Sequence, residues 1–383
     1  MKALAVVLAL FLSPAVAAQP APPRISELAD ELQRTQARIA AGDKAAYSEQ
    51  LTQLKAMAAA IVRAPQETWN NQREADALVI YILSGGAPTE LAALLQGEAI
   101  LESRRALARG AAAYIGGRSA EAAELLGRID PALLSPRIAG QVAFARSVIA
   151  TKRDPKAALA FLDWARLIAP GTLVEEAALR REIALLAEAR DALRTAMLIR
   201  QYAARFARSL YAADFLRDLA GLAAEFSLTD EPAASERLAQ ALAPLEAETK
   251  RVFWLALAKI SAINGRSGPA IAAANEALRY VRADGEQGWR ARLYLDAGKL
   301  LSGEYDSAVA DLQTIPPARL DPSDAALLAY VRGVAAQLRA APNPAAIAAR
   351  ADEAGAAKDA GSAIGLAEEA LKRTADLMEP RSP

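Results

Sequence analysis

Acidic side chains are the groups in this sequence best suited to chemistry, because the chain contains no cysteine and no histidine. Their absence excludes thiolate nucleophiles, imidazole bases, Ser-His-Asp triads and zinc sites built from Cys or His. Paired carboxylates such as Glu175, Glu176 and Asp311 are the type that serves glycoside hydrolysis. Neighbouring helix positions point about 100° apart, so Glu175 and Glu176 would not face one substrate bond.

Other enzyme signatures are equally weak. Gly85-Gly86 and Gly116-Gly117 fall between expected helices, where glycine serves the left-handed C-terminal cap rather than a phosphate loop. A lytic transglycosylase is the enzyme alternative, because some of these carry an α-superhelical domain. Its Glu-Ser pair and Gly-Leu-Met-Gln stretch do not occur here in that context. We therefore expect no catalytic residue, no cofactor and no metal site.

Composition indicates an all-helical protein without a nucleic-acid partner. The 383 residues include 45 Lys and Arg against 45 Asp and Glu, which leaves no net field to attract nucleic acid. The apolar fraction is 53% but the aromatic fraction only 5%. Ala and Leu, both strong helix formers, carry that hydrophobicity.

The N-terminus has the pattern of a secretory signal peptide at residues 1–18. Lys2 precedes the apolar run Ala3–Leu12, and Pro14 precedes small residues that allow cleavage after Ala17 or Ala18. The run is too short to span a bilayer, although an uncleaved anchor is the alternative. We expect a Pro-rich tether at residues 19–24, no membrane span in the mature chain, and export to the periplasm of a Gram-negative bacterium.

Helix pairs repeat along the chain. Apolar periodicity, interrupted by Gly, Asp and Pro, predicts a helix, a tight turn and a second helix in each repeat. The alanines expected to open the second helices recur every 35 to 41 residues, close to the roughly 34 of tetratricopeptide repeats; they are Ala120, Ala157, Ala192, Ala233, Ala270 and Ala308. A small residue there would let the two helices cross closely. We predict an all-α solenoid of tetratricopeptide-like pairs.

Three regions follow from this pattern. Residues 25–96 form N-terminal helical pairs, and residues 97–340 form the tetratricopeptide-like repeats. Residues 341–383 combine an Ala-rich segment with a C-terminal helix that either caps the array or docks on a partner.

One stretch is distinctive. In Ala169–Arg181, Pro170-Gly171 makes a turn and Thr172 caps the next helix. Together with Tyr202–Ala212 and Ala120–Leu126, this stretch resembles the MotC family of periplasmic motility proteins. The resemblance covers most of the mature chain and is strongest between residues 101 and 215.

The resemblance implies a non-enzymatic role in flagellar rotation. MotC-like proteins bind the periplasmic part of the stator protein MotB, and this chain would stabilise or position it. Association of copies around the motor stays open. The alternative is a general periplasmic helical-repeat scaffold for cell-envelope (peptidoglycan) machinery.

Candidate contact residues rest on a surface argument, since Arg and Tyr are enriched in protein interfaces. We expect an acidic patch on MotB to meet six residues: Arg180, Arg181, Tyr202, Arg205, Arg208 and Tyr211. The alternative is a solvated face, with the arginines paired to Glu176 or Glu182 along the helix. Replacing Arg205 and Arg208 by Glu is expected to abolish binding without unfolding the protein.

Overall fold

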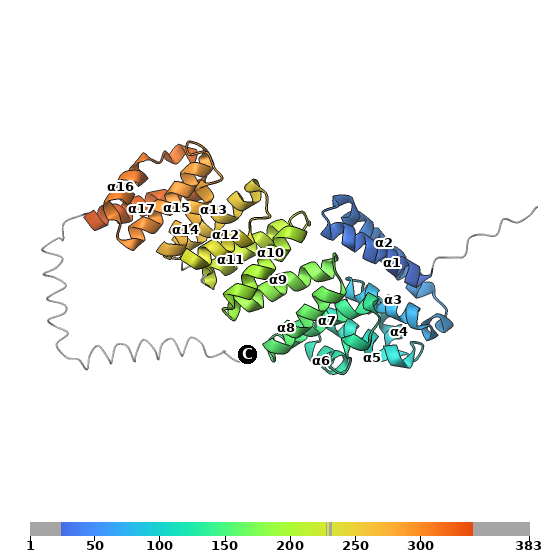
Figure 1. The fold of residues 1–383 in the computed structure, drawn as a ribbon. Coiled ribbons are helices and arrows are strands. Elements are labelled where there is room, and N and C mark those ends of the chain that lie inside the picture. The colour runs from blue at the N-terminus through green and yellow to red at the C-terminus, as the bar shows by residue number, and fades with distance from the viewer. Residues whose placement is uncertain (1–23, 227, 230–231, 340–383) are drawn as a thin grey trace, which may run out of the picture. The chain divides into compact units, whose positions relative to one another are not determined.

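Helices make up every regular element in residues 24–226, 228–229 and 232–339, which the computed structural model describes (Figure 1). The prediction of an all-α solenoid of helix pairs is confirmed. The predicted signal peptide, residues 19–23 of the tether and the segment 341–383 lie outside the described residues.

The chain divides into two compact units, residues 1–257 and 258–383, with the division inside α13 (Ala247–Ile263). The first six α-helices and two short 3-10 helices of the first unit are α1 (Ile25–Ala40), α2 (Lys44–Arg63), η1 (Gln66–Asn70), α3 (Gln72–Leu83), η2 (Pro88–Leu91), α4 (Ala92–Gln96), α5 (Glu102–Ile115) and α6 (Ser119–Gly127). The same unit continues with η3 (Pro131–Leu133), α7 (Pro136–Ala150), α8 (Pro155–Ile168), α9 (Leu173–Glu188), α10 (Ala192–Arg205), α11 (Ala212–Glu225) and α12 (Pro232–Ala241). The second unit holds α14 (Ser267–Leu278), α15 (Glu286–Ser302), α16 (Tyr305–Thr314), η4 (Pro317–Arg319) and α17 (Pro322–Arg339).

Helix starts follow local capping chemistry. Asp43, Asn71 and Asp154 each accept a hydrogen bond from a backbone N–H in the first turn of α2, α3 and α8. Gly42, which precedes Asp43, has a φ of +99° that an L side chain rarely adopts. Gly42, Asp43 and Asp154 are of the residue types that interrupt the apolar periodicity between expected helices.

Polar contacts attach the N-terminal hairpin of α1 and α2 to the rest of the first unit. Glu74 of α3 is nearly buried and accepts hydrogen bonds from the backbone nitrogen of Ser26 at 3.0 Å and from its hydroxyl at 2.6 Å. Arg137 of α7 donates to the carbonyl of Ser26 at 3.1 Å and pairs with Asp30. The start of α1 is thus capped by residues distant in sequence.

Two apolar clusters of the described residues lie in the first unit, among α1 to α9. The larger one joins α1 to α7 and includes the buried side chains Trp69, Leu78 and Leu107. The smaller one joins α7, α8 and α9 through Ala143, Leu162 and Ala178. The alanines of the smaller cluster allow α9 to pack closely against α7 and α8.

The predicted role of the six alanines at the helix starts is only partly correct. Ala270 and Ala308 are fully buried, but Ala120 and Ala233 are exposed, and Ala157 and Ala192 are half-buried. In the early pairs the buried alanine stands one or two residues further along the second helix. These buried alanines are Ala122 of α6 and Ala158 of α8.

Gly140 of α7 allows close packing between α7 and the C-terminal end of α8. A Cβ atom built on Gly140 would lie 2.9 Å from the Cβ of Ala169, closer than such atoms approach in proteins. Gly140 is therefore required by the packing of the α7–α8 pair rather than by its own backbone angles.

In the second unit, α15 packs against α14, α16 and α17. Asp324 of α17 is fully buried and lies 2.8 Å from the amine of Lys259, 2.7 Å from the hydroxyl of Tyr294 and 2.6 Å from Nε of Arg290. Lys259 belongs to α13, and Arg290 and Tyr294 belong to α15. The buried carboxylate of Asp324 therefore links α17 to both helices through three donors.

Candidate partner-binding region on α9 to α11

The distinctive stretch of the sequence forms the junction between α8 and α9. Gly171 takes a φ of +76°, and Thr172 caps α9 by accepting from the backbone nitrogen of Glu175 at 3.4 Å. Glu175 reaches back and accepts from the backbone nitrogen of Gly171 at 2.5 Å. The predicted Thr172 cap is confirmed, and the two residues satisfy backbone donors at the helix start.

Three glutamates of α9 are buried, which the sequence did not suggest. Glu175 and Glu176 are each 1% exposed and Glu182 is 0% exposed. Buried carboxylates are costly unless they are paired or hydrogen-bonded. The hydrogen-bond and ion-pair partners of these glutamates therefore link α9 to α8, to α10 and to the residues after α10.

Glu176 connects α9 to α10 and to the loop before α11. Its carboxylate accepts from the hydroxyl of Tyr202 at 2.9 Å and from the hydroxyl of Ser209 at 2.8 Å. Burial raises the pKa of Glu176, and these two donors and Arg180 oppose the rise. Glu175 makes a parallel connection, accepting from Arg205 at 2.8 Å and from Gln201 at 3.1 Å.

Glu182 is less well satisfied. Arg166 and Arg194 approach its oxygens at 3.4 and 3.3 Å, yet one oxygen of Glu182 accepts no hydrogen bond. Arg166 makes its shortest contact with Asp163 instead, at 2.6 Å. Burial and, to a smaller extent, the neighbouring Asp163 carboxylate raise the pKa of Glu182 to about 7, against the opposing effect of the two arginines.

Tyr202 has a different role from the one expected of a surface contact. It is 1% exposed, and its ring centroid lies 4.2 Å from that of Phe215 and 5.8 Å from that of Phe206. Its hydroxyl is held by Glu176. Tyr202 is thus a core residue, because the apolar face of α10 turns it inward against α9 and α11.

Arg205 and Arg208, close to Tyr202 in the sequence, are exposed at the surface. The Arg205 side chain is 44% exposed but is paired with the buried Glu175. Arg208 is exposed, and within the described part of the chain it forms no ion pair. Replacing Arg205 by Glu would set a second carboxylate against the buried Glu175, so we now expect this change to destabilise the fold as well as to alter the surface.

The other three expected residues are half-buried. The Arg180 guanidinium lies 5.6 Å from the ring centroid of Phe215, and Arg181 donates to the hydroxyl of Thr151 at 2.9 Å. Burial raises the pKa of Tyr211. Neither arginine makes the expected intrahelical pair, because Tyr202 and Ser209 occupy Glu176, and Arg166 and Arg194 approach Glu182.

A contact from the N-terminal hairpin completes this region. A Cβ atom on Gly42 would lie 2.4 Å from the carbonyl oxygen of Arg208, so the turn between α1 and α2 touches the loop between α10 and α11. The sequence marks Gly42 as a turn residue but does not reveal what it meets, because the two positions are far apart along the chain.

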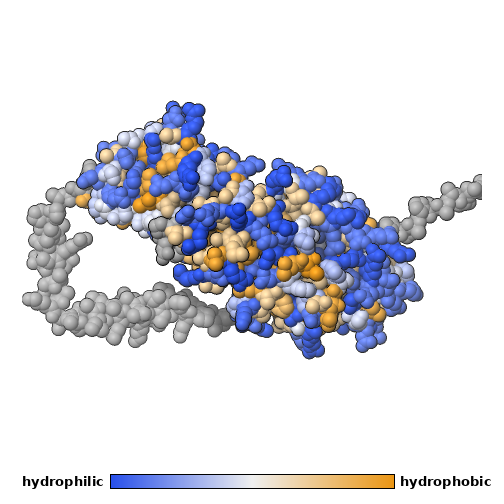
Figure 2. Space-filling model, viewed as in Figure 1, coloured by the Kyte–Doolittle hydropathy of each residue, from blue (hydrophilic) through white to orange (hydrophobic). Residues whose placement is uncertain are grey.

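Glu175 and Glu176, the pair considered above for glycoside hydrolysis, are occupied by separate partners and buried. No group of three or more acidic side chains placed to hold a metal ion occurs in the described ranges. Among the helices of these ranges, none is both long and apolar enough to cross a membrane. On the face that Figure 2 shows, hydrophilic residues cover most of the surface and hydrophobic residues form separate patches.

Comparison with known proteins adds the family to this geometry. The family model described as chemotaxis protein MotC matches residues 1–381. The chain belongs to the MotC family. A relative named chemotaxis protein MotC, from Rhizobium meliloti (strain 1021), is 30% identical over 308 residues, which is 79% of this chain and 70% of the relative.

Membership supports a MotC-like role in chemotaxis and motility. The family consists of motility accessory proteins and is not a known enzyme family. The resemblance first noted at the α8–α9 junction is therefore confirmed over nearly the whole chain.

Proposed function

We propose that this protein acts in the periplasm in flagellar rotation, where it binds the periplasmic part of the stator protein MotB and stabilises or positions it. Membership of the MotC family is the observation that carries this proposal. The secretory pattern at residues 1–18 supports the location. Stacked helix pairs also offer the large contact surface that a protein partner needs.

The proposed contact surface consists of the exposed ends of α10 and the loop to α11. Arg208 is its central residue because it is exposed and unpaired in the described ranges. Arg205 adds a second exposed guanidinium, held in place by Glu175. Arg180, Arg181 and Tyr211 lie half-buried around them, whereas Tyr202 supports the surface from beneath.

A binding titration of the secreted protein against purified MotB periplasmic domain tests this function. We expect saturable binding at micromolar concentration or tighter, a free energy of about −8 kcal/mol or stronger. Light scattering on the same mixture gives the stoichiometry and shows whether copies of this chain associate, as a ring around the motor would require. No binding at high micromolar concentration would favour a general envelope scaffold.

Arg208→Glu tests the surface separately from the function. The change leaves the buried glutamates untouched, and we expect it to weaken MotB binding about tenfold or more, as loss of a central arginine does in other interfaces. Arg153→Glu is the matched control, since Arg153 is also exposed and in no ion pair of the described residues. Equal affinity for both variants would remove α10 and its loop from the interface.

A further inference from the structure

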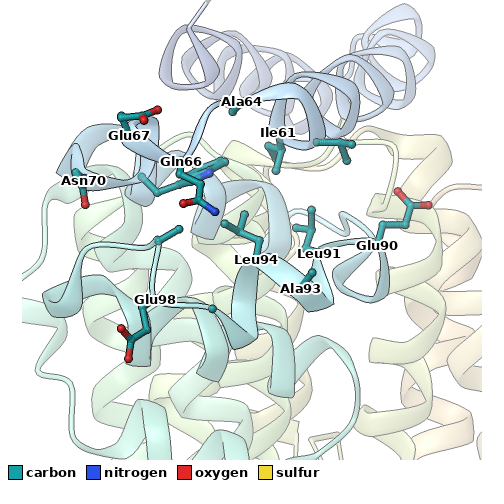
Figure 3. Close-up of a pocket in the computed structure, with 14 residues that line it drawn as sticks. Ile61, Ala64, Gln66, Glu67, Asn70, Glu90, Leu91, Ala93, Leu94 and Glu98 are labelled. Atoms are coloured by element: carbon teal, nitrogen blue, oxygen red, sulfur yellow. The ribbon is translucent and has the colours of Figure 1, made fainter.

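A groove lies in the first unit between the C-terminal end of α2, η1 and the segment from η2 to residue 99 (Figure 3). Its volume is about 720 Å³. The floor is apolar and well ordered by packing, because Ile61, Trp69 and Leu91 are each only 2 to 3% exposed. Leu94 is half-buried, and Figure 3 shows it beside Leu91 near the centre of the groove.

Carboxylates surround this floor. Glu67, Glu90 and Glu98 line the groove and are exposed, and Figure 3 places them around its edge. Within the described residues none of the three forms an ion pair. The groove therefore carries three uncompensated negative charges, whose mutual repulsion a cationic ligand would relieve.

The groove itself supplies no positive charge to neutralise them. The lining residues include neither lysine nor arginine. Two arginines of α5 bind backbone carbonyls of the adjoining turn, with Arg109 donating to Leu95 at 2.5 Å and Arg105 to Glu98 at 3.0 Å. These contacts fix the turn that presents Glu98.

We propose that this groove binds a cationic amphipathic segment of a partner protein. One or two bulky apolar side chains of that segment would pack over Leu91 and Leu94, and its Lys or Arg residues would reach the three carboxylates. Helix-in-groove binding of this kind uses an apolar stripe with i, i+3, i+4 spacing. The volume also falls within the range of about 300 to 1,000 Å³ that is typical of concave ligand sites.

The charge pattern argues against the chain's own C-terminal segment as the occupant. Residues 363–379 contain four acidic and two basic residues, so they carry the same sign of charge as the groove. The proposal is independent of MotB binding, since the groove is built from α2, η1 and α4 rather than from α9 to α11.

A defined probe tests the proposal with the full chain. The probe is a fluorescein-labelled helical peptide of about four turns, with Leu at i, i+3 and i+4 spacing and Lys elsewhere. We expect saturable anisotropy changes with the protein. A second peptide with Ser in place of Leu keeps the charge, and equal binding of that peptide would overturn the apolar half of the proposal.

Charge reversal locates the site. The triple variant Glu67→Lys, Glu90→Lys and Glu98→Lys is expected to bind the Leu-Lys peptide at least about tenfold more weakly. The control reverses three other exposed glutamates without ion pairs in the described residues, Glu31→Lys, Glu188→Lys and Glu225→Lys, and should change affinity less than about twofold.

Two other results of the charge-reversal experiment would overturn the proposal. Equal losses in both triple variants would mean that net charge alone attracts the peptide, and would refute the groove as the site. A change in the light-scattering mass of the unliganded protein on reversal would make a second copy of the chain the occupant. Should circular dichroism show lost helicity, the corresponding triple Gln variants replace both sets.

Discussion

Ionisation of Glu182 is expected to make the first unit less stable as the pH rises. The carboxyl group is fully buried, and its pKa is raised from an ordinary value of 4.5 to about 7. Because the folded state holds this proton more tightly than the unfolded state does, stability falls between pH 4.5 and pH 7. Glu182→Gln keeps the shape of the neutral acid and removes the ionisation.

The size of the effect follows from the pKa difference. A tenfold difference in proton affinity between the folded and unfolded states corresponds to about 1.4 kcal/mol. Between about pH 5 and pH 8, the linked loss for Glu182 amounts to roughly 2 to 3 kcal/mol. Arg166 and Arg194 would not be left unpaired in Glu182→Gln, because both also contact Asp163, at 2.6 and 3.4 Å.

Urea unfolding followed by far-UV circular dichroism measures this at both pH values. We expect Glu182→Gln to match the parent protein near pH 5 and to exceed its stability by roughly 2 to 3 kcal/mol near pH 8. Glu188→Gln is the control, since Glu188 is exposed at the end of the same helix. A stability difference that does not change with pH, or a Glu182→Gln variant weakened at pH 8, would refute the reasoning.

Three further predictions concern packing around α9, α7 and α11. Tyr202→Phe removes a donor from the buried Glu176 and should lower the free energy of unfolding by about 1 to 3 kcal/mol; an unchanged urea midpoint would contradict that role. Gly140→Ala should destabilise by about 1 to 3 kcal/mol, because its methyl group would lie 2.9 Å from the Cβ of Ala169. Gly221→Ala, on α11 with nothing within 4 Å of the new Cβ, should instead stabilise by about 0.5 to 1 kcal/mol, and thermal unfolding of the two variants should shift in opposite directions.

Local sequence determined most of the secondary structure. Thr172 caps α9 as the sequence predicted, and Asp43, Asn71 and Asp154 cap their helices in the same local way, because a cap depends on atoms within three residues of it. The same local character made the α8–α9 junction distinctive enough to indicate the family.

Only the tertiary structure showed which polar side chains are buried and which segments distant in sequence come into contact. Tyr202 fits the composition of a contact surface, yet it is enclosed by Phe206, Phe215 and Glu176. Glu182 follows the ordinary pattern of a charged helix residue, and only the approach of α8 and α10 removes it from water. The groove beside η1 likewise joins residues from positions 61 to 99.

The reason for this division is physical. Caps, turns and apolar periodicity act over one or two helical turns and are therefore written in neighbouring residues. Desolvation of a carboxylate, the fit of a glycine and the charge of a groove depend on what other helices place nearby, and these terms arise only when the chain packs.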